Sequence, residues 1–329
     1  MLNEEKAVSL RNFIIKRTFY SLLLLFFALT LNFVIFRMAP GNPIQIVASA
    51  NRLEPEMVER LIEMWGLQEP LHVQYIRYIK STLTWNFGYS YYSLEPVSRE
   101  IGERLSNTVL LMGVSLAFAC VFGTVFGVYA AYKRGSLFDL SSVTVSLFSF
   151  ALPTFWMGLL LIYVMGYVFG LFPLAGTMSR PPPVDPILRV LDLAWHLFLP
   201  GLTLFLFQYG AWLLMMRSTL LEELHEDYII TARAKGVPER GVLFKHAFRN
   251  AMLPLVTNIA IQIPGLLNGA ILTETVFSWR GLGLYTWSAI QFNDYPVLQA
   301  LFYIFALVTV VCNFLVDIIY GYIDPRIKY

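Results

Sequence analysis

Charged residues are scarce in this chain of 329 residues, which argues against an ordinary soluble domain. Only 14% of the residues are Asp, Glu, Lys or Arg, whereas 57% are hydrophobic. A soluble domain carries roughly 25% charged residues, and the deficit here falls in long apolar runs. The composition therefore predicts a polytopic membrane protein. The net charge of +2 gives no indication of a nucleic-acid partner.

Cysteine and histidine are also rare, and the sequence lacks the spacings that metal sites need. Cys120 and Cys312 lie far apart inside apolar runs, so we interpret them as packing residues and expect no disulfide framework. The four histidines are scattered, and none has a second histidine or a cysteine one helical turn away. No serine lies in a hydrolase arrangement. We therefore predict no catalytic residue, no metal and no cofactor.

Six apolar segments are long enough to cross a membrane as helices. They are residues 18–36, 108–132, 138–171, 193–216, 251–276 and 297–320. Residues 1–17 form a polar tail, and residues 37–105 are too irregular for a span. The latter contain two helical patterns, at 53–67 and 72–83, followed by a tyrosine-rich stretch around Gly88. We predict that residues 37–105 form a small cap.

The third apolar segment, residues 138–171, allows two interpretations. As one helix it would extend roughly 50 Å, whereas the hydrocarbon core is roughly 30 Å thick. Pro153 lies near its middle, so the segment is either one long kinked helix or two crossings. The distribution of basic residues decides between them, because cytoplasmic loops carry an excess of Lys and Arg.

A cytoplasmic N-terminus places most basic residues inside. They lie in the tail, at Lys133 and Arg134, and throughout residues 217–250, whereas the short outer loops carry only Arg180, Arg189 and Arg280. Two crossings by the third segment would move residues 217–250 outside and remove this bias. We therefore predict one crossing, six spans in total, and both termini in the cytoplasm.

Glycine and aromatic residues suggest further local features. Gly123 and Gly127 form a G-x-x-x-G pair that allows close helix contact, although such pairs also arise by chance. A second pair is formed by Gly265 and Gly269. Residues 277–296 are rich in aromatic residues and glycine, which is typical of an interfacial re-entry loop.

A polar, charge-dense segment lies between the fourth and fifth spans and reads EDYIITARAKGVPERGVLFKHAFRNAMLP from Glu226 to Pro254. Residues 220–235 favour a helix with acids first and bases last, as the helix dipole prefers. Gly236 is placed to end this helix in a left-handed cap, and Pro238 to start a second helix. The alternatives are a docking element for a partner and a solvated loop; a structured loop of this length favours docking.

This segment resembles the E-A-A-x-x-x-G loop of ABC importer permeases, in the dipeptide, oligopeptide and nickel branch. Ala232 and Gly236 match the last Ala and the Gly, whereas Ile230 and Thr231 replace the usual Glu and Ala. RMAPGNP, NFGYS, ALPTFWMGLLL and VDIIYGYIDPRIKY also resemble that family. The resemblance implies a loop that couples to an ATPase. Its candidate contact residues are Glu226, Asp227, Thr231, Ala232, Arg233, Ala234, Lys235, Gly236, Val237 and Pro238.

The resemblance also implies the fold, the partners and the function. It implies an all-α polytopic protein in a prokaryotic cell membrane, with an extracytoplasmic cap at 37–105, a permease core at 106–329 and a cytoplasmic coupling hairpin at 217–250. The implied partners are a second permease in a heterodimer, two cytoplasmic ATPase subunits and an external solute-binding protein. No G-x-x-x-x-G-K-[S/T] loop occurs, so ATP hydrolysis is expected on the partners. The implied cargo is a di- or oligopeptide; oligosaccharides and nickel chelates are the alternatives.

Polar residues inside the spans allow a role in the pathway or in helix packing. The candidate pathway residues are Gln208, Asn258, Gln262 and Asn268. Glu274 allows an interfacial or a gating role. Asp139 lies at the inner end of its span, and we expect Asp317 to pair with an Arg of the coupling loop.

Two further function classes remain open from the residues alone. A membrane-embedded enzyme would need catalytic side chains at membrane depth, and the sequence shows no such set. An ion-coupled secondary transporter would work without ATP and would be active as the chain alone. Transport by the isolated chain under an ion gradient would distinguish the secondary transporter from the importer.

Overall fold

A computed structural model describes residues 2–38, 56, 59, 68–262 and 271–323. Within these ranges the chain is almost entirely helical and forms no β-strand, apart from an isolated bridge between Tyr89 and Pro96. Its contacts divide it into two compact units. Unit 1 contains Met1–Ser106 and Gly281–Tyr329, and unit 2 contains Asn107–Gln262 and Gly269–Arg280. The helix that contains the junction at Ser106 contributes residues to both units.

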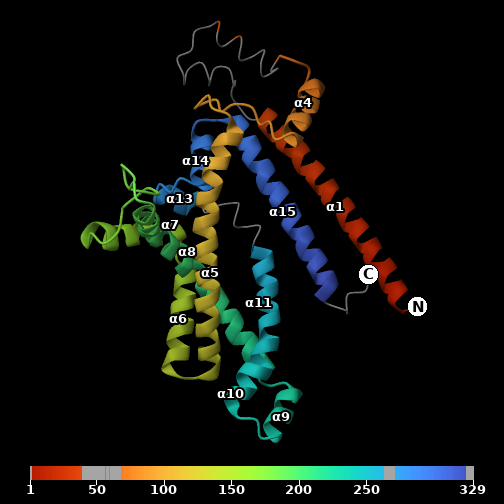
Figure 1. The fold of residues 1–329 in the computed structure, drawn as a ribbon, viewed down its shortest axis with the longest axis vertical. Coiled ribbons are helices and arrows are strands. Elements are labelled where there is room, and N and C mark those ends of the chain that lie inside the picture. The colour runs from red at the N-terminus through yellow and green to blue at the C-terminus, as the bar shows by residue number, and fades with distance from the viewer. Residues whose placement is uncertain (1, 39–55, 57–58, 60–67, 263–270, 324–329) are drawn as a thin grey trace. The chain divides into compact units, whose positions relative to one another are not determined.

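Unit 1 is built around two long antiparallel helices. Its helices are α1 (Leu2–Met38), α4 (Leu71–Leu83), the start of α5 (Val97–Tyr132), α14 (Leu282–Gln291) and α15 (Tyr295–Ile323). Figure 1 shows α1 and α15 lying side by side along most of their length. Leu29 of α1, Ile101 of α5, Leu282 of α14 and Leu301 of α15 share one buried apolar core. This core holds together segments from the beginning and the end of the chain.

Three sequence predictions for unit 1 meet different outcomes. The amphipathic helix expected at 72–83 is confirmed as α4. The helical pattern at 53–67 lies outside the described residues, apart from Glu56 and Glu59. The re-entry loop expected at 277–296 is wrong in its central part, which is the helix α14. Apolar side chains buried at helical spacing, including Leu282, Tyr285 and Ala289, favour a helix there.

Unit 2 contains the remaining helices. They are α6 (Leu137–Ala151), α7 (Thr154–Leu161), the π-helix η1 (Ile162–Val168), α8 (Pro186–Glu223), α9 (Asp227–Ala234), α10 (Glu239–Gly241), the π-helix η2 (Val242–Ala247), α11 (Phe248–Gln262) and α13 (Ile271–Val276). The longest, α8, starts where Asp185 accepts hydrogen bonds from the N–H groups of Ile187 and Leu188 at 2.8 and 3.0 Å. Pro186 occupies the first turn, where a missing N–H costs little.

The glycine pair of α5 brings its backbone against α8 within unit 2. A Cβ atom added to Gly123 would lie 2.5 Å from the Cβ of Trp212, and one added to Gly127 would lie 2.7 Å from the carbonyl oxygen of Leu213. Any larger side chain would therefore push the helices apart. The close contact that the G-x-x-x-G spacing allows is confirmed.

The segment predicted as the third span is not one continuous helix. Pro153 separates α6 from α7, and the pair is bent by 103°. Leu152, which precedes the proline, has the extended conformation that this position favours. With 15 residues, α6 is about 22 Å long, which is short of a full crossing. Whether the pair makes one crossing stays a prediction.

Four described helices are long and apolar enough to span a membrane, and the bent pair would make a fifth. The four are Asn12–Met38, Val97–Tyr132, Pro186–Glu223 and Tyr295–Ile318. The predicted fifth span, 251–276, passes through residues 263–270, outside the described ranges. The chain is thus a polytopic, nearly all-helical membrane protein, and the count of six spans stays a prediction.

Candidate functional site

The polar segment after α8 folds as a short helix that is separate from α8. The single helix expected at 220–235 is wrong, because α8 ends at Glu223 and α9 begins at Asp227. Glu226 has an extended backbone (φ −71°, ψ 150°), which interrupts the helix there. Asp227 in the first turn of α9 and Arg233 in the last turn suit the dipole of this shorter helix.

A tight turn at Gly236 follows α9, as the sequence predicts. Gly236 has φ +76°, a conformation that costs a residue with a side chain about 1–2 kcal/mol. The N–H of Gly236 bonds to the carbonyl of Arg233 at 2.9 Å, and the N–H of Val237 to that of Ala232 at 3.2 Å. Pro238 caps the start of α10, which runs through η2 into α11. Figure 1 shows α9 and α10 together at one end of α8 and α11.

The phenol of Tyr228 connects α9 to both neighbouring long helices. Its hydroxyl donates to the carboxylate of Glu223, the last residue of α8, and accepts from the side-chain amide of Asn250 in α11 at 3.0 Å. Burial raises the pKa of Tyr228, and the hydrogen bond to Glu223 raises it further, so the phenol stays protonated and able to donate. Sequence reasoning missed Tyr228, although a tyrosine within a charged segment was an available signal.

One side of the hairpin is buried and the other is exposed. Ile229, Val242 and Ala247 are fully buried and hold α9 and η2 against the rest of unit 2. Most predicted docking residues are exposed: Glu226, Asp227, Thr231, Arg233, Ala234, Lys235, Gly236 and Pro238. Ala232 is only 6% exposed, so its side chain belongs to the packed side rather than to a docking surface. Ile230 and Phe244, both more than half exposed, were missed as candidates.

An ion pair on the exposed side bridges the turn. Arg233 Nε lies 2.9 Å from Glu239 Oε1, and a second nitrogen lies 3.4 Å from Oε2. Both side chains are substantially exposed, so the pair contributes at most about 1 kcal/mol. Its geometric effect is to hold α9 and α10 in one orientation.

A second ion pair, which the sequence analysis did not predict, connects α8 to α6. Arg217 reaches Asp139 through two hydrogen bonds, of 2.6 Å to Oδ1 and 3.0 Å to Oδ2. Asp139 is buried and also accepts the N–H of Gly135 at 2.9 Å, which fixes the basic turn before α6. This two-point geometry orients both helices.

A pathway role for Gln208, Asn258, Gln262 and Asn268 stays a prediction, and the structure gives side-chain contacts for two of them. Gln208 donates to the carbonyl of Leu204 on its own helix at 3.2 Å. Asn258 of α11 approaches the sulfur of Met215 on α8 at 3.6 Å, which is the alternative interhelical role. Gln262 is exposed at the end of α11, and Asn268 lies outside the described residues.

Glu274 and Asp317, the other acidic residues predicted to lie in the spans, have partners that the sequence did not indicate. Glu274 is fully buried and accepts a hydrogen bond from the Thr108 hydroxyl at 2.9 Å. Asp317 pairs with Arg17 at 2.8 Å, so the expected partner in the coupling loop is wrong. Among the described side chains, no three His, Cys, Asp or Glu residues come together as a metal site would require.

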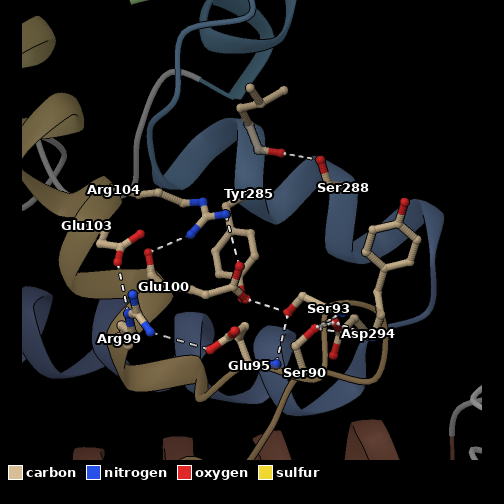
Figure 2. Close-up of polar contacts among 12 residues, drawn as sticks. Ser90, Ser93, Glu95, Arg99, Glu100, Glu103, Arg104, Tyr285, Ser288 and Asp294 are labelled. Carbon is tan, nitrogen blue, oxygen red and sulfur yellow. Dashed lines mark hydrogen bonds and ion pairs between the residues drawn. The ribbon is translucent and has the colours of Figure 1, made fainter. Parts of the chain in front are cut away.

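A polar cluster in unit 1 fastens residues 88–105 to α14 and to the turn before α15 (Figure 2). Asp294 accepts hydrogen bonds from the Ser90 hydroxyl at 2.5 Å and from the N–H groups of Tyr91 and Tyr92 at 3.0 and 3.3 Å. Nearby, Tyr285 bonds to Glu100 at 2.5 Å. These contacts fix the part of the predicted cap that leads into α5.

Comparison with known proteins gives consistent matches over nearly the whole chain. Residues 123–329 match the family described as "binding-protein-dependent transport system inner membrane component". Residues 10–112 match the family that describes the N-terminal part of the membrane component of such systems. The chain is 38% identical over 319 residues to the di/tripeptide transport system permease protein DppB of Pseudomonas aeruginosa, covering 92% of this chain and 95% of that protein.

Two further relatives are similar over almost their full length. The oligopeptide transport system permease protein AppB of Bacillus subtilis is 38% identical, with 96% of this chain and 99% of that protein covered. The glutathione transport system permease protein GsiC of Escherichia coli K12 is 35% identical, with 97% of this chain and 99% of that protein covered.

Proposed function

Because the chain belongs to the family of binding-protein-dependent transport system inner membrane components, we propose that it is the permease subunit of an ATP-driven importer of di- and oligopeptides. The names of three relatives, which refer to di/tripeptides, oligopeptides and glutathione, support a peptide cargo. The observation that carries the coupling mechanism is the junction at Tyr228, which connects α9 to both α8 and α11.

Oligosaccharides are the alternative cargo, and the aromatic residues at 85–92 are the feature that would favour them, because aromatic faces stack on sugar rings. In the structure these rings contact other parts of unit 1. Tyr91 is buried, Tyr92 stacks on Phe292 with ring centroids 4.0 Å apart, and Trp85 packs edge-to-face with Tyr303. Rings that pack against one another favour a structural role. These aromatic residues therefore do not support a sugar cargo over a peptide.

The proposed topology has six spans with both termini in the cytoplasm. Residues 37–105 form the extracytoplasmic cap, residues 106–329 the permease core, and residues 217–250 the coupling loop. The basic residues of that loop, together with Lys133 and Arg134, support this orientation. The bent pair α6–α7 counts as one crossing in this proposal.

The proposed partners are two cytoplasmic ATPase subunits, a second, homologous permease subunit and a solute-binding protein. ATP binding brings the two ATPases together, and each carries one coupling hairpin with it. The exposed residues of the hairpin, including Ile230, Arg233 and Lys235, face the ATPase in this proposal. The chain itself has no phosphate-binding loop of the Walker type.

Hairpin movement reaches the membrane through three connections in unit 2. Tyr228 transmits displacement of α9 to the ends of α8 and α11. The buried Ile229 keeps α9 from moving independently of the packed side. The pair of Arg217 and Asp139 then passes a tilt of α8 to α6. Movement of packed helices against one another is one established way to alternate access between two faces of a membrane.

Reconstitution of the complete importer tests this function. The complex is purified from its native membrane, its companion subunits are identified, and peptide uptake into liposomes is measured with the binding protein and ATP. We expect ATP-dependent uptake of di- and oligopeptides, and none with the chain alone under an ion gradient. Binding of cello-oligosaccharides without peptide by the cognate binding protein would contradict the peptide assignment.

A further inference from the structure

A cavity of about 320 Å³ lies in unit 1, where the end of α1 meets α4 and the start of α15. Its walls are mainly aromatic and polar. They include Phe33 and Arg37 of α1, Arg77 and Tyr78 of α4, and Tyr295 of α15. The volume is near the lower end of the range for small-molecule sites, which suits a compact group rather than a long chain.

The cavity is positively charged, and its charge comes mainly from Arg37. Among the described residues, its lining contains two guanidinium groups and no carboxylate. Arg77 already pairs with Glu69 at 2.5 Å. Arg37 lies over the ring of Phe33, 5.9 Å from its centroid, and forms no ion pair with any carboxylate of the described residues. A half-buried guanidinium in this setting favours an anionic ligand.

Hydrogen-bond donors surround the same space. Gln74, Ser81, Thr82 and Asn86 contribute polar side chains to the lining. Tyr91 lines the cavity together with Arg37, and burial raises the pKa of its phenol, whereas the charge of Arg37 lowers it. Tyrosine hydroxyls that stay protonated donate to oxyanions. The lining thus combines Arg37, which pairs with no carboxylate of the described residues, with several neutral polar side chains. Of these, Gln74 and Ser81 also donate to backbone carbonyls.

The position of Arg37 indicates which oxyanion is available. The apolar span of α1 is Asn12–Met38, so Arg37 lies at its end, at the depth of the lipid headgroups. Leu31, Val34 and Ile35 leave apolar side chains exposed on α1 just below it. A phospholipid places a phosphate at this depth and acyl chains along such a surface.

We propose that this cavity binds the phosphate headgroup of an anionic phospholipid, with Arg37 as the principal ligand and the acyl chains lying along the exposed face of α1. The assignment rests on the membrane span and the cavity, and it is independent of the peptide cargo. In the proposed topology the site lies on the extracytoplasmic side. The lipid would hold α4 and the start of α15 against α1.

Lipid binding to the purified full-length chain tests the proposal by native mass spectrometry. Phosphatidylglycerol and phosphatidylethanolamine with the same acyl chains are titrated separately. We expect one site that binds phosphatidylglycerol at least roughly tenfold more tightly than phosphatidylethanolamine. Both lipids carry the phosphate, but the ammonium of phosphatidylethanolamine would bring a further positive charge to a cavity lined by two guanidinium groups. Equal binding of the two lipids to the wild-type chain would overturn the proposal without any variant.

Substitutions then locate the site. R37Q should remove the preference for phosphatidylglycerol, R37K should retain part of it, and R99Q, which changes an exposed guanidinium outside the cavity, should leave it intact. An unchanged preference in a folded R37Q chain contradicts the assignment. Displacement of phosphatidylglycerol by a dipeptide, but not by its C-terminally amidated form, would instead identify a peptide carboxylate site and overturn the lipid assignment.

Discussion

The phenol of Tyr228 in α9 accepts a hydrogen bond from the amide of Asn250 in α11 at 3.0 Å, across 22 residues of chain that include the Gly236 turn. The contact closes the hairpin at its base. The hydroxyl donates in the other direction to Glu223 of α8. One side chain therefore joins three helices, so a displacement of α9 acts directly on the long helices α8 and α11.

Tyr228→Phe removes this junction while keeping the ring. We expect weaker coupling, seen as a several-fold loss of peptide-stimulated ATPase activity in the reconstituted importer. The reason is the loss of two hydrogen bonds, each contributing about 1 kcal/mol. Tyr20→Phe is a matched control, since Tyr20 is an exposed tyrosine of α1. Equal coupling in Tyr228→Phe and the wild type would show that the junction does not transmit movement.

Ile229 and Ile230 are adjacent isoleucines with opposite environments, 0% and 58% exposed. Ile229→Ala should lower the free energy of unfolding by about 2–4 kcal/mol because it leaves a cavity under α9. Ile230→Ala should leave thermal stability nearly unchanged and weaken binding to the ATPase, measured by pull-down of the purified subunits. A stability loss in Ile230→Ala as large as that in Ile229→Ala would refute the exposed docking side.

Gly236→Ala tests the turn itself. Alanine at φ +76° should cost about 1–2 kcal/mol and shift the exposed end of α9, so substrate-stimulated ATPase activity should fall while the complex still assembles. Gly113→Ala is the matched control, because Gly113 lies in α5 with no atom within 4 Å of an added Cβ. Normal stimulation by Gly236→Ala would mean that the turn geometry is not needed for coupling.

The local shape of the hairpin was predictable because its signals are local. Gly236 and Pro238 act on their own backbone angles, and both do so in the structure as their residue types predict. The break at Glu226 was not predictable in this way. It depends on Ile229 packing and on Tyr228 reaching Glu223 and Asn250, and such contacts are invisible to a helical pattern.

Within the membrane segments, too, local features were predictable and long-range contacts were not. The G-x-x-x-G pair at Gly123 and Gly127 indicated a close contact but not its partner, which is α8. Pro153 indicated a break but not its angle of 103°. The partner of Asp317 was predicted wrongly, since Arg17 is 300 positions away and only the packing of α1 along α15 brings the two together. Long-range pairings of this kind have no local signature in a single sequence.

The pair of Arg217 and Asp139 gives the last prediction, on stability and coupling together. Asp139→Ala leaves the guanidinium of Arg217 without its buried partner, so the free energy of unfolding should fall by about 3 kcal/mol. The double variant Asp139→Ala with Arg217→Ala removes both charges and should be more stable than Asp139→Ala alone. Thermal unfolding in detergent measures both. If the pair also links α8 to α6, the double variant should be more stable than Asp139→Ala but should have the same low peptide-stimulated ATPase activity. The buried unpaired charge of Arg217 is gone in the double variant, whereas the connection between the two helices is still missing. Recovery of both properties would show that the ion pair is structural only.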